Sequence, residues 1–244
     1  MTFLFKGFQG HKMKSGCFIP IKEHSERLPG KNFKILAGKP LYQHIIDNVR
    51  KANCFNAKYV DTDSPEIIEY AVDNDFSVII REERLNKKNG NDLLLHHFNV
   101  IPDLDFYFQL FATAPFLTPT TIIKCVATLM DSATKNDSIF TVCEQKGWHW
   151  FGGDPINYNP SELPRSQDAQ GIWKETTGLY GITRDALAWT NRRIGLDPIL
   201  YQVENDEAVD IDTEFDFFVA NAISNPRSFP SAGCGIRPPH PVEG

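Results

Sequence analysis

Short apolar runs of the β type alternate along most of this chain with stretches in which apolar residues recur at helical spacing. An alternation of strands with helices favours parallel pairing, because two parallel neighbours need a long crossover between them. We therefore expect an α/β fold of three layers, with a mainly parallel sheet between two layers of helices. Strands are predicted at 17–19, 57–60, 76–80, 106–111, 138–142, 177–182 and 199–203, and helices are predicted to begin near 40, 64, 91, 118, 184 and 213.

Three of these helices carry start signals. Ser64 is a suitable N-cap and precedes Pro65, which the first helical turn tolerates because it needs no N–H donor there. Thr118 precedes Pro119 in the same way. Asn91 can cap the helix that lies between them along the chain.

Composition fits one ordinary globular domain. The chain has 244 residues, 41% of them hydrophobic and 23% charged. Its formal charge of −6 argues against binding to a nucleic-acid backbone, which usually requires a basic protein. No apolar run is long enough for a membrane helix, so we expect no membrane partner. The five cysteines are odd in number and form no C-x-x-C pair, which favours reduced thiols and a cytoplasmic protein.

Domain boundaries follow from where the alternation stops. Residues 1–16 show no signal-peptide core and are interpreted as an N-terminal extension, while the proline-rich residues 224–244 are interpreted as an irregular tail. The core domain, 17–223, is interrupted at about 144–176 by a segment rich in aromatic residues. That segment is too long for a connector, so we interpret it as a lobe that packs on a second subunit. A lid folded on the chain's own core is the alternative.

The loop after the first strand, residues 20–32, is a candidate phosphate site. A loop that joins a buried strand to a helix is a common place for phosphate groups in α/β proteins. A solvated basic loop is the alternative. Neither a G-x-G-x-x-G nor a G-x-x-x-x-G-K-[ST] sequence occurs, which removes support for dinucleotide oxidoreductases and P-loop proteins. The loop supplies three cations and three other donors: Lys22, Arg27, Lys31, Ser25, Gly30 and Asn32.

A second motif lies at residues 209–214. Asp210 and Asp212 are two residues apart, a spacing that places both carboxylates on one face of an extended segment. Paired carboxylates suit Mg²⁺, which binds through one or two protein ligands together with substrate phosphates. The alternative is a helix start, with Asp212 or Thr213 as N-cap and Glu214 in the first turn.

Together these two motifs resemble the acylneuraminate cytidylyltransferase family, whose members activate acidic sugars with CTP. The first loop is similar to the family pattern I-P-A-R-x-x-S-K-x-x-P-x-K-N, with Lys22 in place of Arg and Glu26 in place of Lys. The second motif is similar to D-I-D-T-E-x-D, and Asp216 extends the match. The resemblance implies a nucleotide-diphospho-sugar transferase-like fold, with the insertion as a dimerisation element.

The resemblance also implies roles for individual residues. Lys31, Asp210 and Asp212 would be catalytic, and the two aspartates would bind Mg²⁺ as the cofactor. Arg81 and the segment Gly90-Asn91-Asp92 are similar to the family's cytosine-binding stretch. For Arg81 the alternative is a strand-end cation paired with Glu82 or Glu83. The remaining nucleotide contacts would be Lys22, Ser25, Arg27 and Asn32, and the sugar contacts would be Arg165, Gln167, Thr177 and Tyr180.

The implied activity is transfer of CMP from CTP to the anomeric hydroxyl of an acidic nonulosonic-type sugar, with release of pyrophosphate, by a homodimer. Phe111 stands where sialic-acid enzymes have a glutamine that contacts the sugar, so the sequence does not assign sialic acid itself. Two alternatives stay open: another sugar nucleotidyltransferase, or a non-catalytic nucleotide-binding protein of the same fold. His96 and His97 are adjacent and point about 100° apart on a helix, so we interpret them as surface residues rather than a metal pair.

Overall fold

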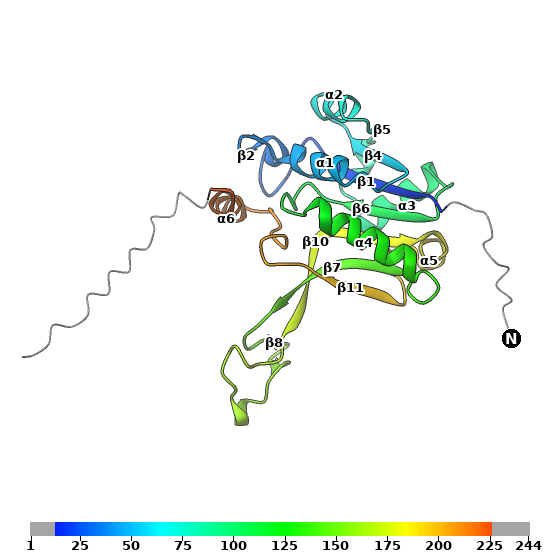
Figure 1. Ribbon diagram of the computed structural model, residues 1–244. Helices are drawn as coiled ribbons and strands as arrows, with labels where there is room; N and C mark the ends of the chain where they lie inside the picture. The colour runs from blue at the N-terminus through cyan, green and yellow to red at the C-terminus, as the bar shows by residue number, and fades with distance from the viewer. Residues whose placement is uncertain (1–12, 226–244) are drawn as a thin grey trace, which may run out of the picture.

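A seven-stranded sheet forms the centre of the molecule in the computed structural model, which describes residues 13–225 (Figure 1). The strand order is β11-β7-β10-β6-β1-β4-β5. β10 runs antiparallel to β6 and β7, and the other neighbouring pairs are parallel. The mainly parallel sheet predicted from the sequence is therefore confirmed. Its strands are β1 (Ser15–Ile21), β4 (Ala57–Thr62), β5 (Ser77–Ile80), β6 (Phe106–Leu110), β7 (Ser138–Gln145), β10 (Ile172–Thr183) and β11 (Pro198–Gln202).

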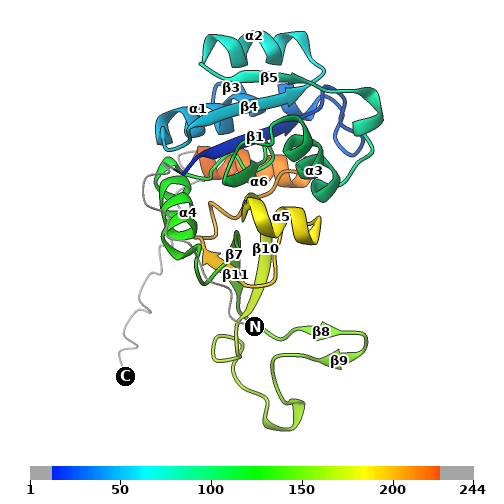
Figure 2. The same cartoon turned by 90° about the vertical axis from the view of Figure 1, so that its right-hand side faces the viewer.

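Helices cover both faces of this sheet, as the three-layer prediction requires. Buried side chains of α1 (Leu41–Ala52), α2 (Pro65–Asp73) and α4 (Pro119–Ser132) form one large core with one face of the sheet. α3 (Gly90–Val100) and α5 (Arg184–Thr190) pack on the opposite face in a smaller core, and Figure 2 shows them side by side. Strand alternation divides the two cores, because Cys17, Ile19 and Ile21 of β1 enter the first core and Phe18 enters the second. The last helix, α6, spans Glu214–Ser224.

Most predicted helix starts are confirmed, and one is wrong by two residues. The Thr118 hydroxyl accepts a hydrogen bond from the backbone N–H of Thr121 (3.2 Å) and so caps α4. Ser64 occupies the N-cap position of α2 without a side-chain capping bond. The cap of α3 is Asn89 and not Asn91, since the Asn89 Oδ1 accepts from the backbone N–H groups of Asn91 (2.9 Å) and Asp92 (3.1 Å).

The ends of the core extend slightly beyond the predicted 17–223. β1 begins at Ser15, whose backbone N–H donates to Asn56 Oδ1 (2.8 Å), and α6 continues to Ser224. Most of the predicted extension and tail, residues 1–12 and 226–244, lies outside the described part of the chain. Within residues 13–225, no helix has the length and apolar character needed to cross a membrane.

The aromatic insertion is a small lobe carried by β7 and β10, which extend together away from the body (Figure 1). Residues 172–175 of β10 pair with 142–145 of β7, so the predicted interruption begins and ends inside a strand pair. Asn157 organises the lobe, because its amide bridges the backbone carbonyls of Gly147 (2.7 Å) and Gln170 (2.6 Å). The large side chains of the lobe are nevertheless exposed on this chain: Trp148, Trp150, Phe151, Ile156, Leu163 and Trp173.

Short elements complete the fold. The lobe holds a two-stranded ribbon, and another ribbon precedes α1. Among residues 13–225, three single-turn 3-10 helices lie in loops. These elements are β2 (Ile35–Leu36), β3 (Lys39–Pro40), β8 (Trp150–Phe151), β9 (Asp154–Pro155), η1 (Lys31–Phe33), η2 (Glu83–Leu85) and η3 (Pro160–Glu162).

Candidate active site

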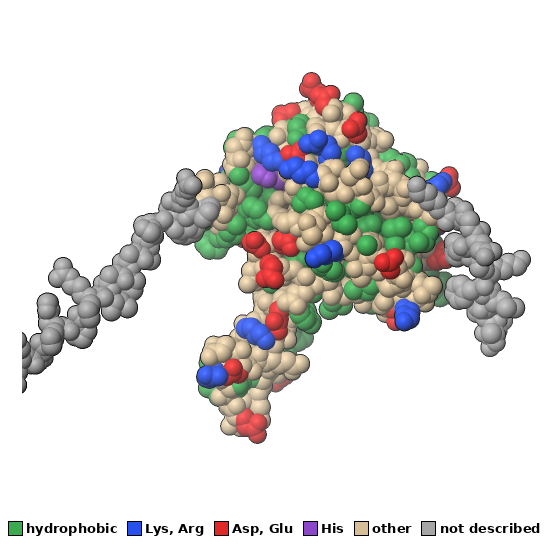
Figure 3. Space-filling model, viewed as in Figure 1, with side chains coloured by type: hydrophobic (Ala, Val, Ile, Leu, Met, Phe, Trp, Pro, Cys, Tyr) green, Lys and Arg blue, Asp and Glu red, His purple; other side chains and the backbone are tan. Residues whose placement is uncertain are grey.

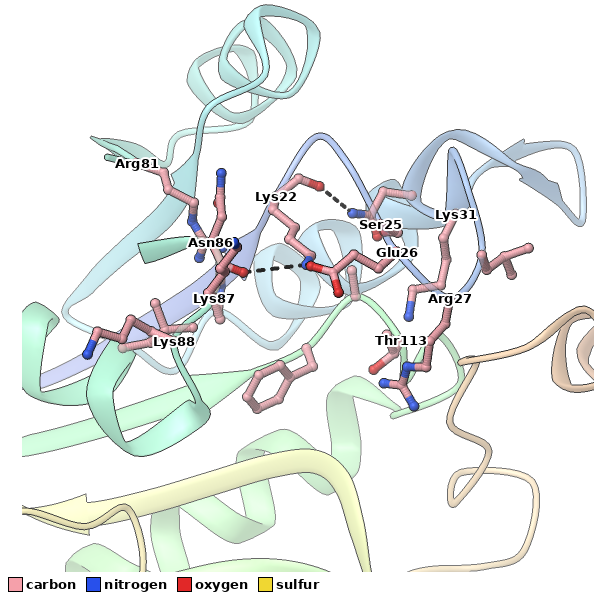
Figure 4. A pocket seen from close by; sticks show the side chains of 16 residues that line it. Lys22, Ser25, Glu26, Arg27, Lys31, Arg81, Asn86, Lys87, Lys88 and Thr113 are labelled. Atoms are coloured by element: carbon pink, nitrogen blue, oxygen red, sulfur yellow. Dashed lines mark hydrogen bonds and ion pairs between the residues drawn. The ribbon is translucent and has the colours of Figure 1, made fainter. Parts of the chain in front are cut away.

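A cavity of about 540 Å³ lies beyond the carboxyl ends of strands β1, β5 and β6 (Figure 4). Each strand leads directly into residues that line it: 22–32 after β1, Arg81 after β5, and 111–113 after β6. This position is where open α/β sheets commonly bind ligands. Five residues predicted from the first loop line this one cavity, namely Lys22, Ser25, Arg27, Lys31 and Asn32.

The first loop is held in place by its own polar groups and by a small apolar cluster. Gly30 has φ of 65°, a left-handed conformation that glycine adopts without a Cβ penalty, and it begins the turn of η1. The Asn32 amide donates to the backbone carbonyl of Lys22 (2.8 Å), which closes the loop. Leu28 is buried against Ile211 of the second motif. The loop is therefore packed directly on the segment that carries the aspartates.

Lys31 connects the two sequence motifs. Its side chain is 11% exposed, and its Nζ donates to the backbone carbonyl of Ile211 (2.8 Å) and to Asp212 Oδ1 (3.0 Å). Arg27 reaches the same carboxylate oxygen at 2.8 Å. The backbone N–H of Ile211 donates to Thr113 O (2.9 Å), which ties the second motif to the end of β6. Residues 180 and 181 positions apart in the chain are thus brought together beside the cavity.

The second motif does include a helix start, and of the two N-cap candidates, Asp212 and Thr213, the structure selects Thr213. Thr213 and Asp216 form a capping box at α6, in which each side chain accepts from the backbone N–H of the other residue. Asp216 Oδ2 also accepts from the backbone N–H of Asp212 (3.1 Å). Burial would raise the pKa of Asp216, but these hydrogen bonds outweigh it and lower that pKa. Thr213 and Asp216 therefore supply the side-chain caps of α6, and the carboxylates of Asp210 and Asp212 take no part in capping it.

Asp210 and Asp212 line one side of a second cavity of about 430 Å³, together with Lys174 and the first turn of α6. The Asp210 Oδ1 is buried and has no hydrogen-bond partner among the residues described. Acidic side chains also gather on the surface over the loop between β11 and α6 (Figure 3). A buried, unpartnered carboxylate oxygen in an acidic region is suited to a hard cation.

The donor set fits Mg²⁺ rather than a metal held by protein alone. Across residues 13–225, no group of three or more His, Cys, Asp or Glu side chains could hold a metal ion. Mg²⁺ does not need such a group, because substrate phosphates and water complete its coordination. Asp210, with Asp212 beside it, would supply the one or two carboxylates required.

Arg81 is part of a buried network that the sequence did not reveal. Its Nε and Nη2 donate to the two oxygens of Asp61 (both 3.0 Å), not to Glu82 or Glu83. His97 Nε2 lies 2.8 Å from Asp61 Oδ2, and all three side chains are at most 3% exposed. The prediction that His97 lies on the helix surface is therefore wrong. The prediction fails because His97 lies on the face of α3 that packs on the sheet. There its imidazole stacks on Phe18, with 4.8 Å between ring centroids.

Burial and hydrogen bonding set the protonation states of Asp61 and His97 in this network. Burial would raise the pKa of Asp61, but the hydrogen bonds from His97 and Arg81 and the guanidinium charge lower it. Burial lowers the pKa of His97 despite the attraction of Asp61, so His97 is neutral near pH 7. The hydrogen bond to Asp61 places the imidazole proton on Nε2. Arg81 is consequently held rigidly where β5 meets the cavity.

The segment Gly90-Asn91-Asp92 lies at the start of α3. Asn91 Oδ1 accepts from the backbone N–H of Arg193 (2.9 Å), and Asp92 faces Lys88 (3.7 Å). The cavity wall nearby is formed instead by Lys87, Lys88 and Leu93. These three predicted nucleotide contacts therefore border the cavity region without forming its wall.

The four predicted sugar-binding residues separate into two pairs. Arg165 and Gln167 are exposed on the lobe, where Arg165 pairs with Asp168 (2.5 Å). Thr177 and Tyr180 belong to β10 within the body of the molecule. The Tyr180 hydroxyl is buried and donates to Glu175 Oε1 (2.5 Å). One chain alone does not bring the two pairs together.

Sequence reasoning missed Asp61, His97 and Arg193. Asp61 was visible as a charged residue at the end of an apolar strand, in Val60-Asp61-Thr62. A buried charge there requires a partner, but the sequence did not indicate which cation would supply it. Arg193 lies after α5, and its guanidinium stacks on Tyr180 at 3.6 Å from the ring centroid. No local pattern marks that contact.

Comparison with known proteins agrees with this geometry. A family model described as cytidylyltransferase matches residues 17–185. CMP-N,N'-diacetyllegionaminic acid synthase of Legionella pneumophila is 37% identical over 218 residues, which cover 84% of this chain and 94% of that protein. N-acylneuraminate cytidylyltransferase A of Danio rerio is 29% identical over 206 residues, covering 80% of this chain and 47% of that protein.

A solved structure of CMP:2-keto-3-deoxy-manno-octonic acid synthetase complexed with CTP shares the fold, with a TM-score of 0.64 at 18% identity, covering 88% of this chain and 99% of that chain. Together with the family match, these similarities show that the chain belongs to the cytidylyltransferase family. It spans about half the length of several curated N-acylneuraminate cytidylyltransferases that it matches.

Proposed function

We propose that this protein transfers CMP from CTP to the anomeric hydroxyl of an acidic sugar and releases pyrophosphate. The observation that carries the proposal is the meeting of Lys31 with Asp212 at 3.0 Å beside a cavity at the strand ends. A cation that can reach phosphate then lies next to carboxylates that can hold a cation. Nucleotidyl transfer needs that combination, because negative charge must be neutralised on both the reacting and the departing phosphates.

The first loop supplies the positive charge for the triphosphate. Arg27 and Lys31 lie at the Asp212 end of the cavity, and Lys22 lines its wall (Figure 4). The Lys22 ammonium contacts Glu26 (3.6 Å) and the carbonyl of Asn86 (3.5 Å), so this wall is less positive than its lysine alone would make it. Binding of the triphosphate at Arg27 and Lys31 would compete with Asp212 for both cations. Asp212 would then be freed for a metal.

Asp210 and Asp212 would hold Mg²⁺, which when bound supplies Lewis-acid polarisation of the α-phosphate and charge neutralisation for pyrophosphate. The residues of the chain do the rest by positioning. The sugar hydroxyl attacks the α-phosphorus in line while Lys31 and Arg27 hold the phosphate oxygens. Electrostatics and orientation dominate such transfers, and no covalent enzyme intermediate is required.

The lobe supports the further proposal of a homodimer. Its exposed aromatic side chains, Trp148, Trp150 and Phe151 among them, are of the type enriched in interface cores. An interface there would remove apolar surface from water, at about 25 cal/mol per Å². If the lobe reaches the partner's cavity, Arg165 and Gln167 would act there. Four described cysteines are free thiols, which fits the proposal of a cytoplasmic location.

The test is pyrophosphate release measured with each nucleoside triphosphate in turn. The acceptor panel contains N-acetylneuraminic, legionaminic, pseudaminic and 3-deoxy-manno-octulosonic acids. We expect release with CTP and Mg²⁺, and only when one of these acids is present. Preference for UTP or GTP together with a sugar phosphate would overturn the proposal.

A further inference from the structure

Arg193 is a cation near the cavity that no sequence motif marks. Its guanidinium lies 3.6 Å above the ring centroid of Tyr180 and 5.8 Å from that of Phe111, and Phe111 lines the cavity of the first loop. The charge of Asp210, which lines the second cavity, also acts on Tyr180. Burial is the largest cause that raises the Tyr180 pKa, and the nearby charge of Asp210 raises it further. Arg193 therefore lies beside a residue of the first cavity's wall.

The position of the guanidinium is well defined. The guanidinium contacts the face of Tyr180, and the backbone N–H of Arg193 donates to Asn91 Oδ1 (2.9 Å). Gly90 makes room for it, because a Cβ at that position would lie 2.3 Å from Arg193 Nη1. The guanidinium therefore lies against the first turn of α3, and that positive helix end adds to its attraction for an anion.

The charge of Arg193 is incompletely matched by protein. Glu175 approaches Nη2 at 3.3 Å through a single oxygen, Oε1, and the same oxygen accepts the shorter hydrogen bond from the Tyr180 hydroxyl at 2.5 Å. A guanidinium can hold a carboxylate through two parallel hydrogen bonds, and this contact is not of that kind. The Arg193 side chain remains 21% exposed.

Buried polar atoms without partners occur on β6 and β10, the two strands that carry Gln109 and Tyr180. Gln109 is fully buried opposite Tyr180 in the β6–β10 pairing, and its Oε1 lacks a hydrogen-bond partner within the described chain. Thr177 Oγ1, three residues before Tyr180 on β10, also lacks a hydrogen-bond partner among the described residues. Buried polar atoms are normally paired, so unpaired oxygens on these two strands indicate positions that a ligand fills. Their chemistry fits hydroxyl groups around a carboxylate, as in a polyhydroxylated acid.

We propose that Arg193 binds the carboxylate of the acceptor acid, over a floor formed by Tyr180 and Phe111. This rests on the proposed function and assigns the acceptor's charge to a residue of the same chain as Lys31. Arg165, which the sequence had suggested for that role, is exposed on the lobe. Arg193 is therefore a substrate-binding residue of the acceptor side and not part of the triphosphate site.

The experiment compares Arg193→Gln with the wild-type protein on an acid and on its neutral methyl ester. The acid is the member of the panel that gives the highest wild-type turnover, and CTP is saturating. We expect Arg193→Gln to lower kcat/KM for the acid about 10- to 100-fold, the usual worth of a charge-assisted contact. For the methyl ester, and for the KM of CTP, the change should be less than about twofold.

Controls separate binding from structure. Arg192→Gln makes the same change at the exposed neighbour. It should leave kcat/KM for the acid and for the methyl ester within about twofold of the wild-type values. Arg193→Lys keeps a charge without the planar fork and should give an intermediate loss for the acid alone. If thermal unfolding shows that Arg193→Gln does not fold, Arg193→Lys tests the assignment instead. The quantity compared is again the loss of kcat/KM for the acid relative to the loss for the methyl ester.

Equal losses for acid and ester would overturn the assignment and make Arg193 a structural brace for Tyr180. An unchanged kcat/KM for the acid, or a rise in the KM of CTP as large as the effect on the acid, would also overturn it. A wild-type protein that uses none of the acids would instead refute the proposed function, before any substitution is made, and this assignment with it.

Discussion

Asp212 accepts contacts from two cations at one oxygen, Arg27 at 2.8 Å and Lys31 at 3.0 Å, while its side chain stays 26% exposed. We expect Asp212→Asn to lower kcat by at least about 100-fold, because it removes a carboxylate proposed to hold Mg²⁺. Its free energy of unfolding should change by less than about 1 kcal/mol, since partly exposed ion pairs are worth little. Steady-state pyrophosphate release and thermal unfolding measure both.

A matched control is available in the same segment. Asp206 is exposed and its Oδ1 accepts only locally, from the backbone N–H of Glu207 (2.9 Å). Asp206→Asn should retain near-wild-type turnover. Wild-type turnover in Asp212→Asn at saturating Mg²⁺ would remove Asp212 from the catalytic machinery.

The Asp61–Arg81–His97 network predicts how stability depends on pH. Burial lowers the folded-state pKa of His97 below its ordinary value of 6.5, so the unfolded chain binds this proton more readily. Stability is therefore fully present above pH 6.5 and is lost as the pH falls below it. The lowered pKa of Asp61 acts in the same direction at still lower pH.

His97→Gln tests this prediction, because glutamine can still donate to Asp61 but does not titrate. Chemical denaturation at pH 7.5 and at pH 5 should show a smaller loss of stability for His97→Gln than for the wild type. His96→Gln, a change at the half-buried neighbour, serves as the control and should follow the wild-type dependence. Identical pH dependence in all three proteins would show that His97 is not the titrating group.

At the scale of single residues, the sequence indicated candidate site residues that lie in local motifs, and it missed residues that are held by distant partners. Lys31 and Asp212 were identified because each lies in a recognisable segment. The contact of Asp61 with Arg81 and His97 depends on β4, β5 and α3 meeting, and no spacing in the sequence encodes that meeting.

Among the elements, the loop between β11 and α6 depends on α4 for its position. Glu207 accepts from the backbone N–H of Thr118 (2.7 Å) and from the hydroxyl of Thr121 (2.9 Å), and so satisfies donors in the first turn of α4. We expect Glu207→Ala to cost about 1–2 kcal/mol of stability. It should also lower kcat about tenfold by loosening the loop that carries Asp210.

Denaturant titration and pyrophosphate release measure these two effects. Glu204→Ala, at an exposed position in the same loop, is the comparison and should change neither. A stable Glu207→Ala protein with full activity would mean that the loop is held without α4.

Helix starts were predictable where a single capping signal was present, as at Thr118, whereas at α6 the sequence left Asp212 and Thr213 open and the structure selects Thr213. They were ambiguous at α3, because Asn89 and Asn91 are both capable caps and only the structure selects Asn89. The outer halves of β7 and β10 were missed for another reason. Residues 173–175 are exposed, so no apolar alternation marks them as a strand.

For the whole molecule, the exposed aromatic lobe predicts a homodimer. Light scattering at micromolar concentration should give twice the mass of the 27.7 kDa chain. The double substitution Trp150→Ser and Phe151→Ser should shift the protein toward monomer, because both side chains are more than half exposed on one chain. A wild-type monomer under these conditions would contradict the prediction.

Mixing two inactive chains tests whether Arg165 acts on the partner's site. If it does, a heterodimer of an Arg165→Ala chain with a Lys31→Ala chain has one site with both lesions and one with neither. Activity should then reappear on mixing. Confirmed heterodimers without activity would place the action of Arg165, if any, within its own chain.

The three-layer architecture followed from the alternation of strands and helices, but the strand order did not. β10 is antiparallel because the lobe, and not a crossover helix, connects it to β7. Pairing between distant strands is set by how helices cover the two faces, which local sequence does not specify.

The most direct test of the proposed function is pyrophosphate release with CTP, Mg²⁺ and the panel of acidic sugars. We predict release that requires both CTP and one of the acids, and that yields the corresponding CMP-sugar in equal amount. Absence of product with every acid, or faster release from UTP or GTP with a sugar phosphate, would contradict it.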